Sequence, residues 1–191
     1  MRVESGNAKG RRLQSVSGRL VRPTSGRVRQ ALFNMLRERV PGSIFVDMFA
    51  GTGSVGLEAL SQGACYVYFV EKDRGALAAL RANVRHCGAE AMATVLAAEL
   101  PQALQKLPAT PQADIIFLDP PYASHLAPAT LDAVGEHGIL APDGLIVWQH
   151  AAQNQPHASP RHNLVIAKRY GNTQLSFLTP AKGAPWASEC S

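Results

Sequence analysis

The stretch "DMFAGTGSVGLEAL", residues 47–60, decides the fold. It begins at the end of an apolar run that is typical of a buried strand, and it continues into a segment typical of a helix ended by Gly63. Gly51, Gly53 and Gly56 therefore have the spacing GxGxxG between a strand and a helix, the context that this pattern requires. Glycine lets the turn close tightly and lets the backbone approach a ligand. The stretch predicts a ligand-binding strand–loop–helix unit.

A carboxylate stands at the end of the next expected strand, "YVYFVE", residues 66–71. Glu71 follows Gly51 by 20 residues, a position from which a carboxylate can accept hydrogen bonds from both hydroxyls of a ribose. The glycines and Glu71 together predict a cofactor that contains adenosine. The alternative interpretation is a glycine turn followed by an unrelated acid.

Asp47 distinguishes between adenosine cofactors. It lies four residues before Gly51, where a carboxylate would repel the pyrophosphate of a nicotinamide cofactor. The same carboxylate could receive an ammonium group, directly or through water. S-adenosylmethionine (SAM) carries an ammonium, a sulfonium and a ribose but no phosphate, so Asp47 favours SAM.

Expected strands and helices alternate along the chain, which predicts an α/β fold with a parallel sheet covered on both faces. The expected strands are 43–49, 66–71, 92–97, 114–119 and 144–149, and the expected helices are 25–36, 54–63, 74–87, 99–107 and 126–137. A closing pair of strands in 163–179, joined by a Gly-Asn turn, adds an antiparallel edge. A hairpin is expected in 2–16, whereas 150–163 and the tail after Thr179 look loose.

The second chemical motif is "FLDPPYA", residues 117–123, at the end of the expected fourth strand. An amino group conjugated to a purine ring is a weak nucleophile because its lone pair is delocalised. Asp119 and the carbonyl of Pro120 could accept hydrogen bonds from its two hydrogens, and Tyr122 could stack on the base. Pro120 and Pro121 are rigid and carry no backbone donor to compete. The motif predicts methyl transfer by in-line displacement, although it could also be a strand stop followed by a loop.

The positive charge is concentrated near the N-terminus. Residues 1–39 carry ten Lys and Arg against two Glu, a net of +8, whereas residues 40–191 carry nine against twelve acids, a net of −3. The expected helix at 25–36 would bury one stripe and turn Arg27, Arg29 and Arg37 outward. This distribution favours a nucleic acid partner, with a solvated basic face or attraction to acidic lipids as alternatives.

Composition limits the protein class. A chain of 191 residues with 46% hydrophobic and 17% charged residues fits a single globular domain. Cys65, Cys87 and Cys190 are scattered without a CxxC pair, which argues against a disulfide framework and a zinc site. With no secretory signal or membrane-spanning run visible, we expect a cytoplasmic protein without a metal.

Five motifs together resemble the RsmD family of bacterial methyltransferases, which modify the N2 amino group of guanine in 16S ribosomal RNA. They are "RPTSGRVRQALFNML" (22–36), "FAGTGSVGLEALSQGA" (49–64), "VEKDR" (70–74), "FLDPPY" (117–122) and "RYGNTQLSF" (169–177). The resemblance implies a Rossmann-like class I SAM-dependent methyltransferase with a mostly parallel seven-stranded sheet and an antiparallel C-terminal hairpin strand. It also implies three regions: a basic N-terminal hairpin extension (1–23), the methyltransferase domain (24–180) and a flexible tail (181–191).

The resemblance also implies roles for individual residues. Cofactor-binding roles fall on Asp47, Gly51, Gly53, Glu71 and, aligned where the family usually has Asp or Asn to meet the adenine amino group, Glu99. Catalytic roles fall on Asp119, Pro120, Pro121 and Tyr122. RNA-binding roles are implied for Arg22, Thr24, Arg27 and Arg29. Gln149 stands where the family often has Glu and receives no role, and His125 lies in a loop that could touch RNA.

The expected partner is 16S rRNA, within a small ribosomal subunit or an assembly intermediate, bound by a monomer. Two other functions remain open. A DNA adenine-N6 or cytosine-N4 methyltransferase could use the same DPPY motif, although no separate target-recognition domain is visible. A non-catalytic SAM-binding ribosome assembly factor would need the glycine loop but not Asp119.

Overall fold

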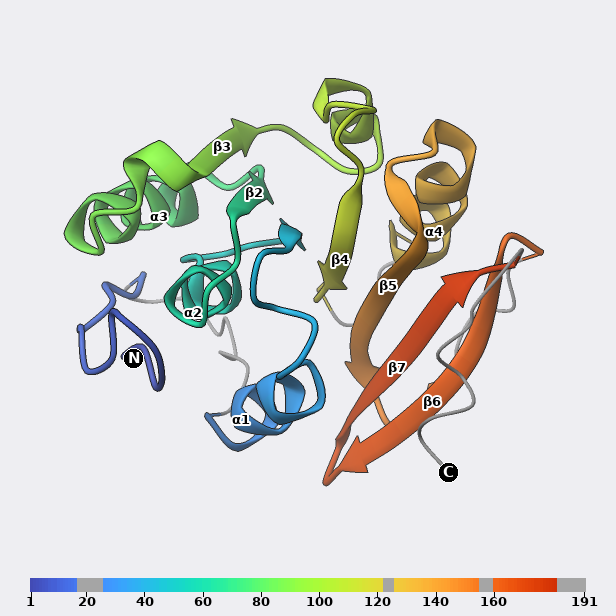
Figure 1. Cartoon of the computed structure of the whole chain (residues 1–191), viewed down its shortest axis with the longest axis horizontal. Coiled ribbons are helices and arrows are strands. Elements are labelled where there is room, and N and C mark those ends of the chain that lie inside the picture. Colours follow the sequence, from blue (N-terminus) through green and yellow to red (C-terminus); the bar gives the residue numbers. More distant parts are fainter. Residues whose placement is uncertain (17–25, 122–125, 155–159, 182–191) are drawn as a thin grey trace.

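The computed structural model describes residues 1–16, 26–121, 126–154 and 160–181, and it contains one central sheet flanked by helices (Figure 1). The helices of these ranges are α1 (Gly26–Met35), α2 (Ser54–Ser61), α3 (Arg74–His86) and α4 (Leu126–His137), with 3₁₀ turns η1 (Glu90–Met92) and η2 (Gln102–Lys106). The strands are β1 (Ile44–Met48), β2 (Tyr66–Glu71), β3 (Ala93–Ala97), β4 (Ala113–Leu118), β5 (Leu140–Ala151), β6 (His162–Tyr170) and β7 (Thr173–Pro180).

The sheet has seven strands in the order β3-β2-β1-β4-β5-β7-β6, which runs across Figure 1 from upper left to lower right. Strands β1 to β5 are parallel, and β7 pairs antiparallel with β5 and with β6. The strand order reverses between β1 and β4, and ligands of open α/β sheets bind at the carboxyl ends of the strands beside such a point. The predicted fold class is confirmed.

Alternation along the strands divides the core between the two faces of the sheet. In β1, Phe45 packs in one apolar cluster with α1, α2 and α3, while Val46 and Met48 pack in a second cluster with η2 and α4. Asp47 points to the first face, where its side chain meets α2. Because helices cover both faces, these strands are apolar on both sides. Polar residues remain at the carboxyl ends of these strands.

Most predicted elements lie within a few residues of the observed ones. The expected helix at 99–107 is the shorter 3₁₀ turn η2, and β5 extends beyond the expected 144–149 at both ends. Part of the stretch that looked loose, 150–163, belongs to β5 and β6, and 155–159 lie outside the described residues. The predicted division into an extension, a domain and a tail stays a prediction.

The N-terminal segment, residues 1–16, is paired with itself and seated on the first face of the sheet. Arg2 and Arg12 form an isolated antiparallel bridge, supported by bonds from Val3 N to Arg11 O and from Leu13 N to Met1 O, 3.0 and 2.9 Å. The expected hairpin pairing is present, but no continuous strands form. Because the side chains of Val3 and Leu13 are buried in the core, the segment is part of the packed domain.

Buried polar side chains of α2 hold this segment in place. The carboxylate of Glu58 is 1% exposed and accepts hydrogen bonds from the backbone N–H groups of Glu4 and Ser5, both at 2.8 Å. Ser61 accepts from Ala8 N at 2.8 Å and donates to the carbonyl of Ser5. These bonds satisfy backbone groups that no sheet ladder reaches.

The prediction that α1 turns Arg29 outward is wrong. Arg29 is 2% exposed, donates to Arg2 O at 2.8 Å and pairs with Glu4 Oε1 at 2.6 Å, with Glu58 Oε2 at 4.0 Å. The buried stripe of α1 comprises Val28, Arg29, Leu32, Phe33 and, just beyond the helix, Leu36. Arg29 lies on this stripe because the carboxylates of Glu4 and Glu58 need a cation where they are removed from water.

Candidate active site

Asp47 is a buried carboxylate at the carboxyl end of β1. It is 2% exposed, and its Oδ2 accepts a hydrogen bond from Gly56 N in the first turn of α2 at 2.9 Å. Burial raises the pKa of Asp47 to about 7; the Gly56 N–H opposes the rise, and the carboxylates of Asp119 and Glu71 add to it. A carboxyl group with a pKa near neutrality, beside two further acids, is a feature of functional sites because a bound cation can relieve it.

Glu71 connects the end of β2 to the glycine loop. Its Oε2 accepts from Gly51 N at 2.8 Å, and its Oε1 accepts from Lys72 N and Asp73 N, each at 2.8 Å. Ala50 N also donates to Val70 O at 3.0 Å, so backbone and side chain both fix the loop against β2. Gly51 and Glu71, which the sequence predicts to bind one cofactor, are therefore in direct contact.

The three glycines of the loop serve different purposes. Gly51 has a φ of 57°, and a Cβ added to it would meet nothing within 4 Å, so the chain is open to a ligand there. At Gly53, which has a φ of 82°, an added Cβ would lie 2.3 Å from Cδ1 of Leu80. A Cβ on Gly56 would lie 2.3 Å from Cε1 of Phe69, so Gly53 allows the loop to pack closely on α3 and Gly56 allows α2 to pack closely on β2.

Asn83 is a polar residue of this site that the sequence reading missed. Its side chain is fully buried in α3, and its Nδ2 donates to Thr52 O in the glycine loop at 2.9 Å. The same amide accepts from Gln14 N at 2.7 Å and donates to Gln14 O at 3.1 Å. It thus connects the N-terminal segment to the loop. An Asn between the apolar residues of an amphipathic helix was the available signal, because a buried amide needs partners.

The DPP motif directly follows β4 and lies beside the glycine loop. Asp119 N donates to Met48 O of β1 at 3.4 Å, and Met48 is in register with Leu118, so Asp119 follows β4 at the same edge of the sheet as Asp47. Asp119 is half-buried, Pro120 is buried and Pro121 is exposed. Tyr122 and His125 lie outside the described residues. The carboxyl ends of β1, β2 and β4 thus bring Asp47, Glu71 and Asp119 together.

Two residues at the neighbouring strand ends differ in their surroundings. Glu99, which follows β3, is exposed and pairs with Lys72 Nζ at 2.5 Å. Gln149 is buried in β5. Trp148 is in register with Leu118, so the next residues, Gln149 and Asp119, lie at the same height along neighbouring strands. The expected role of Glu99 stays a prediction.

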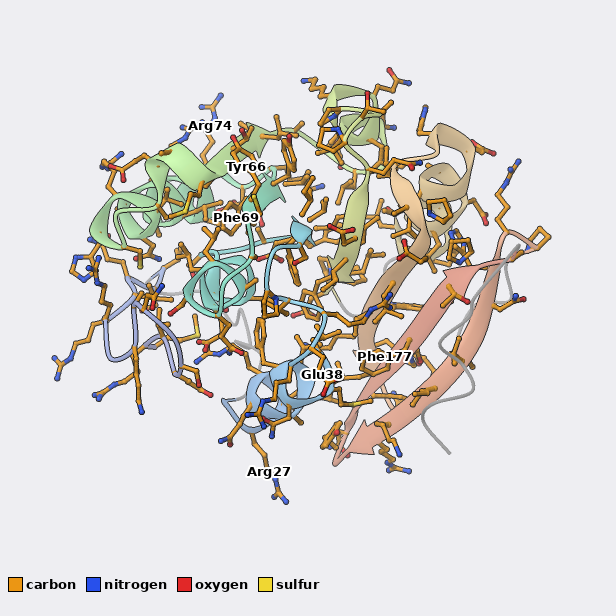
Figure 2. The ribbon with its side chains drawn as sticks, in the orientation of Figure 1. Arg27, Glu38, Tyr66, Phe69, Arg74 and Phe177 are labelled. Carbon is orange, nitrogen blue, oxygen red and sulfur yellow. The ribbon has the colours of Figure 1, made fainter. Side chains whose placement is uncertain are left out.

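Only part of the predicted RNA side can be placed. Arg27 is exposed and projects away from α1 (Figure 2), as expected. Arg22 and Thr24 lie outside the described residues. Within the described ranges, no helix is long and apolar enough to cross a membrane, and no group of three His, Cys, Asp or Glu residues could hold a metal ion.

Comparison with known proteins identifies the family of this fold and site. A family model described as "Conserved hypothetical protein 95" matches residues 1–179. The "Putative rRNA methyltransferase YlbH" of Bacillus subtilis is 37% identical over 152 residues, which cover 78% of this chain and 82% of that protein. Ribosomal RNA small subunit methyltransferase D of Haemophilus influenzae is 32% identical over 171 residues, 88% of each chain. The chain belongs to the RsmD family.

A solved structure has the same fold. A hypothetical protein of Thermus thermophilus superimposes with a TM-score of 0.79 and 34% sequence identity, covering 94% of this chain and 99% of that chain. RsmD-family proteins are SAM-dependent methyltransferases, so SAM is the cofactor of this chain and the predicted cofactor is confirmed.

The residues at the carboxyl edge fit SAM. Gly51 leaves open space where the backbone can approach a ligand, and Glu71 stands within hydrogen-bonding reach of the same loop. Within the described part of the chain, Asp47 has no cationic partner, and the ammonium group of SAM is a cation of suitable chemistry. The glycine loop and these carboxylates could therefore hold SAM, and the role of each residue stays a prediction.

Proposed function

We propose that this protein transfers the methyl group of SAM to the exocyclic N2 amino group of a specific guanine in 16S ribosomal RNA. The observation that carries the proposal is the position of Asp119, half-buried beside the glycine loop and followed by two prolines. An acceptor beside a cofactor loop, next to a segment without backbone donors, suits an amino group with two hydrogens to donate.

In this proposal Asp119 and the Pro120 carbonyl orient the amino group and Tyr122 stacks on the base. Bound SAM supplies an electrophilic methyl carbon on a sulfonium. The hydrogen bonds hold the nitrogen in a more pyramidal form, so its lone pair can point at that carbon. The amino nitrogen would then form a bond to the methyl carbon as the carbon–sulfur bond breaks, and the electrons of the carbon–sulfur bond would stay on sulfur. The methylated nitrogen then loses one proton to Asp119 or to water. Positioning and electrostatics supply the acceleration.

Asp47, Gly51, Gly53 and Glu71 would hold SAM, with Glu99 at the adenine. Buried Asp47 would receive the ammonium group, which would favour its ionised form. Oε2 of Glu71 accepts a hydrogen bond from Gly51 N in this structure. When SAM is bound, this oxygen would accept from a ribose hydroxyl instead. Arg22, Thr24 and Arg27 would contact RNA phosphates. Arg29 is excluded from this set because its guanidinium is buried against Glu4.

The choice of RNA rests on charge and on the relatives. The first 39 residues carry a net charge of +8, which suits a polyanion. The Haemophilus influenzae relative is named as a methyltransferase of small-subunit ribosomal RNA. We propose 16S rRNA, within a small subunit or an assembly intermediate, as the substrate, and we propose further that the protein acts in the cytoplasm as a monomer.

Transfer of labelled methyl from SAM to naked 16S rRNA, small subunits and DNA, measured in parallel, tests the proposal. Digestion to nucleosides and mass spectrometry should then show N2-methylguanosine in RNA and no label in DNA. Asp119→Ala is the negative control. Label in N6-methyladenine or N4-methylcytosine of DNA would establish the DNA methyltransferase alternative. SAM binding without label in any substrate would favour the non-catalytic assembly factor.

A further inference from the structure

Helix α3 carries a stripe of arginines that the cofactor site does not use. Arg74, Arg81 and Arg85 lie on its exposed face, opposite the buried residues Ala76, Ala79 and Asn83. The three positions span about 16 Å along the helix axis at 1.5 Å per residue. None of the three forms an ion pair or a side-chain hydrogen bond within the described part of the chain.

These arginines do not stabilise the helix in an obvious way. Arg74 is the first residue of α3, where a cation is unfavourable next to the positive end of the helix dipole. Arg81 and Arg85 are four residues apart, so like charges face each other on the surface. Only Arg85, in the last turn, is placed favourably for the dipole. A stripe that weakens its own helix electrostatically suggests an external partner.

The N-terminal segment extends the stripe into a larger surface. Arg11 Nη1 donates to His86 O at the end of α3 at 2.6 Å, and Asn83 holds Gln14 by two hydrogen bonds. Arg11 thus contacts the end of the helix, and the same segment carries three further exposed cations: Arg2, Lys9 and Arg12. Residues 1–16 and 73–90 together carry seven Lys and Arg against three acids, a net of +4.

Two of these three acids are already occupied. Glu4 is paired with Arg29, and Asp73 accepts a hydrogen bond from Ala76 N at the start of α3. Glu90 remains as the exposed acid at one border of the surface. The potential over α3 and the N-terminal segment is therefore positive across most of its extent.

This surface, which we call the α3 surface (Arg2, Lys9, Arg11, Arg12, Arg74, Arg81 and Arg85), begins beside the cofactor site. Arg74 follows Glu71 by three residues, and Figure 2 shows it at the outer side of α3. From there α3 runs back toward the amino ends of the strands, so the surface leads away from Asp119.

We propose that the α3 surface binds the phosphate backbone of the rRNA at a distance from the methylated base. The inference rests on the proposed function and extends it, since it assigns contacts to α3 in addition to the residues near the cofactor mouth. Arginine suits this role because its planar guanidinium contacts phosphate oxygens in pairs. Such contacts fix orientation without reading sequence.

The double substitution Arg81→Gln/Arg85→Gln tests the proposal, because both side chains are exposed and their loss should leave folding intact. Binding to a 16S rRNA transcript is measured between 50 and 300 mM KCl. We expect the slope of log K against log salt to become shallower by roughly 0.7–0.9 for each lost phosphate contact, and affinity at 0.15 M salt to fall roughly ten- to thirty-fold. The KM for the transcript should rise in parallel, with an unchanged dissociation constant for SAM.

Lys106→Gln/Arg161→Gln is the matched control, since it removes two exposed cations on the η2 and α4 side of the sheet. Its salt slope should equal that of the wild type. An equal slope for Arg81→Gln/Arg85→Gln would overturn the inference while leaving methyl transfer intact. A defect seen with small subunits but not with the naked transcript would also overturn it, because the surface would then meet an acidic protein. Failure of the wild type to methylate any RNA would instead overturn the proposed function, independently of these slopes.

Discussion

Two regions of the molecule contain the same kinds of polar residue in different surroundings. One is the contact between the N-terminal segment and helices α1 to α3, which we call the seam, and the other is the carboxyl edge of the sheet. In the seam, Arg29, Glu58 and Asn83 are almost completely buried, and each is hydrogen-bonded to chain far away in sequence. At the edge, Asp119 and Glu71 are only partly buried and stand beside a loop that is open to a ligand.

The difference shows that residue type alone does not separate structural from chemical roles. A buried charge must be paired within the protein, so its removal affects folding. A half-buried carboxylate at an open loop can exchange its partners for a ligand, so its removal affects binding or turnover. Substitutions in the two regions should therefore change different measured quantities.

The largest expected effect belongs to Arg29 in the seam. Arg29→Ala would leave Glu58 buried without a cation and should lower the free energy of unfolding by about 3 kcal/mol, the low end for a broken buried pair because Glu4 is partly exposed. Urea unfolding measures the loss. Arg27→Ala on the same helix is the control and should change stability by no more than about 0.5 kcal/mol, because Arg27 is exposed. Equal stability of the two variants would contradict the distinction between the regions.

Asp119 at the edge should show the reverse pattern. Asp119→Ala should lower the single-turnover rate by on the order of a hundred-fold or more, the scale for one preorganised polar partner of a transition state, with little change in unfolding or SAM affinity. Asp119→Asn should be milder because its amide oxygen still accepts a hydrogen bond. If Asp119→Ala instead unfolds easily but turns over normally per folded molecule, the motif is only a strand stop.

Sequence reasoning succeeded where spacing implied geometry. Gly51 and Glu71 are 20 residues apart, yet parallel pairing of β1 with β2 brings Gly51 N and the Glu71 carboxylate into contact. It failed where only charge was counted. Arg27 and Arg29 look alike in a basic stretch, but two residues along a helix differ by about 200° in direction, and the burial of Arg29 depends on Glu58 from another helix. Contacts of this kind depend on tertiary packing, which periodicity within one helix does not show.

Glu71 shares features of the seam and of the carboxyl edge. Its carboxylate accepts hydrogen bonds from three backbone N–H groups, and it also faces the open loop. Glu71→Ala should weaken SAM binding a few-fold to a hundred-fold, about 1–3 kcal/mol. It should also reduce stability by roughly 1–2 kcal/mol, since the freed donors lose their acceptor. Calorimetric titration and urea unfolding separate the two effects. Glu90→Ala, at an exposed acid of η1, should change neither quantity.

The smallest and sharpest effect concerns the proton on Asp47, whose pKa burial raises to about 7. If ionised Asp47 receives the ammonium of SAM, binding lowers this pKa and releases a proton. Affinity should therefore be low where Asp47 is protonated and should rise as pH passes through 7, by about tenfold between pH 6 and pH 8. Titrations at several pH values should be expressed as the ratio of wild-type to Asp47→Asn affinity, because the ratio cancels ionisation of SAM itself. Asn retains an acceptor for Gly56 N but cannot ionise, so a ratio that stays constant with pH would place Asp47 with the buried structural groups of the seam.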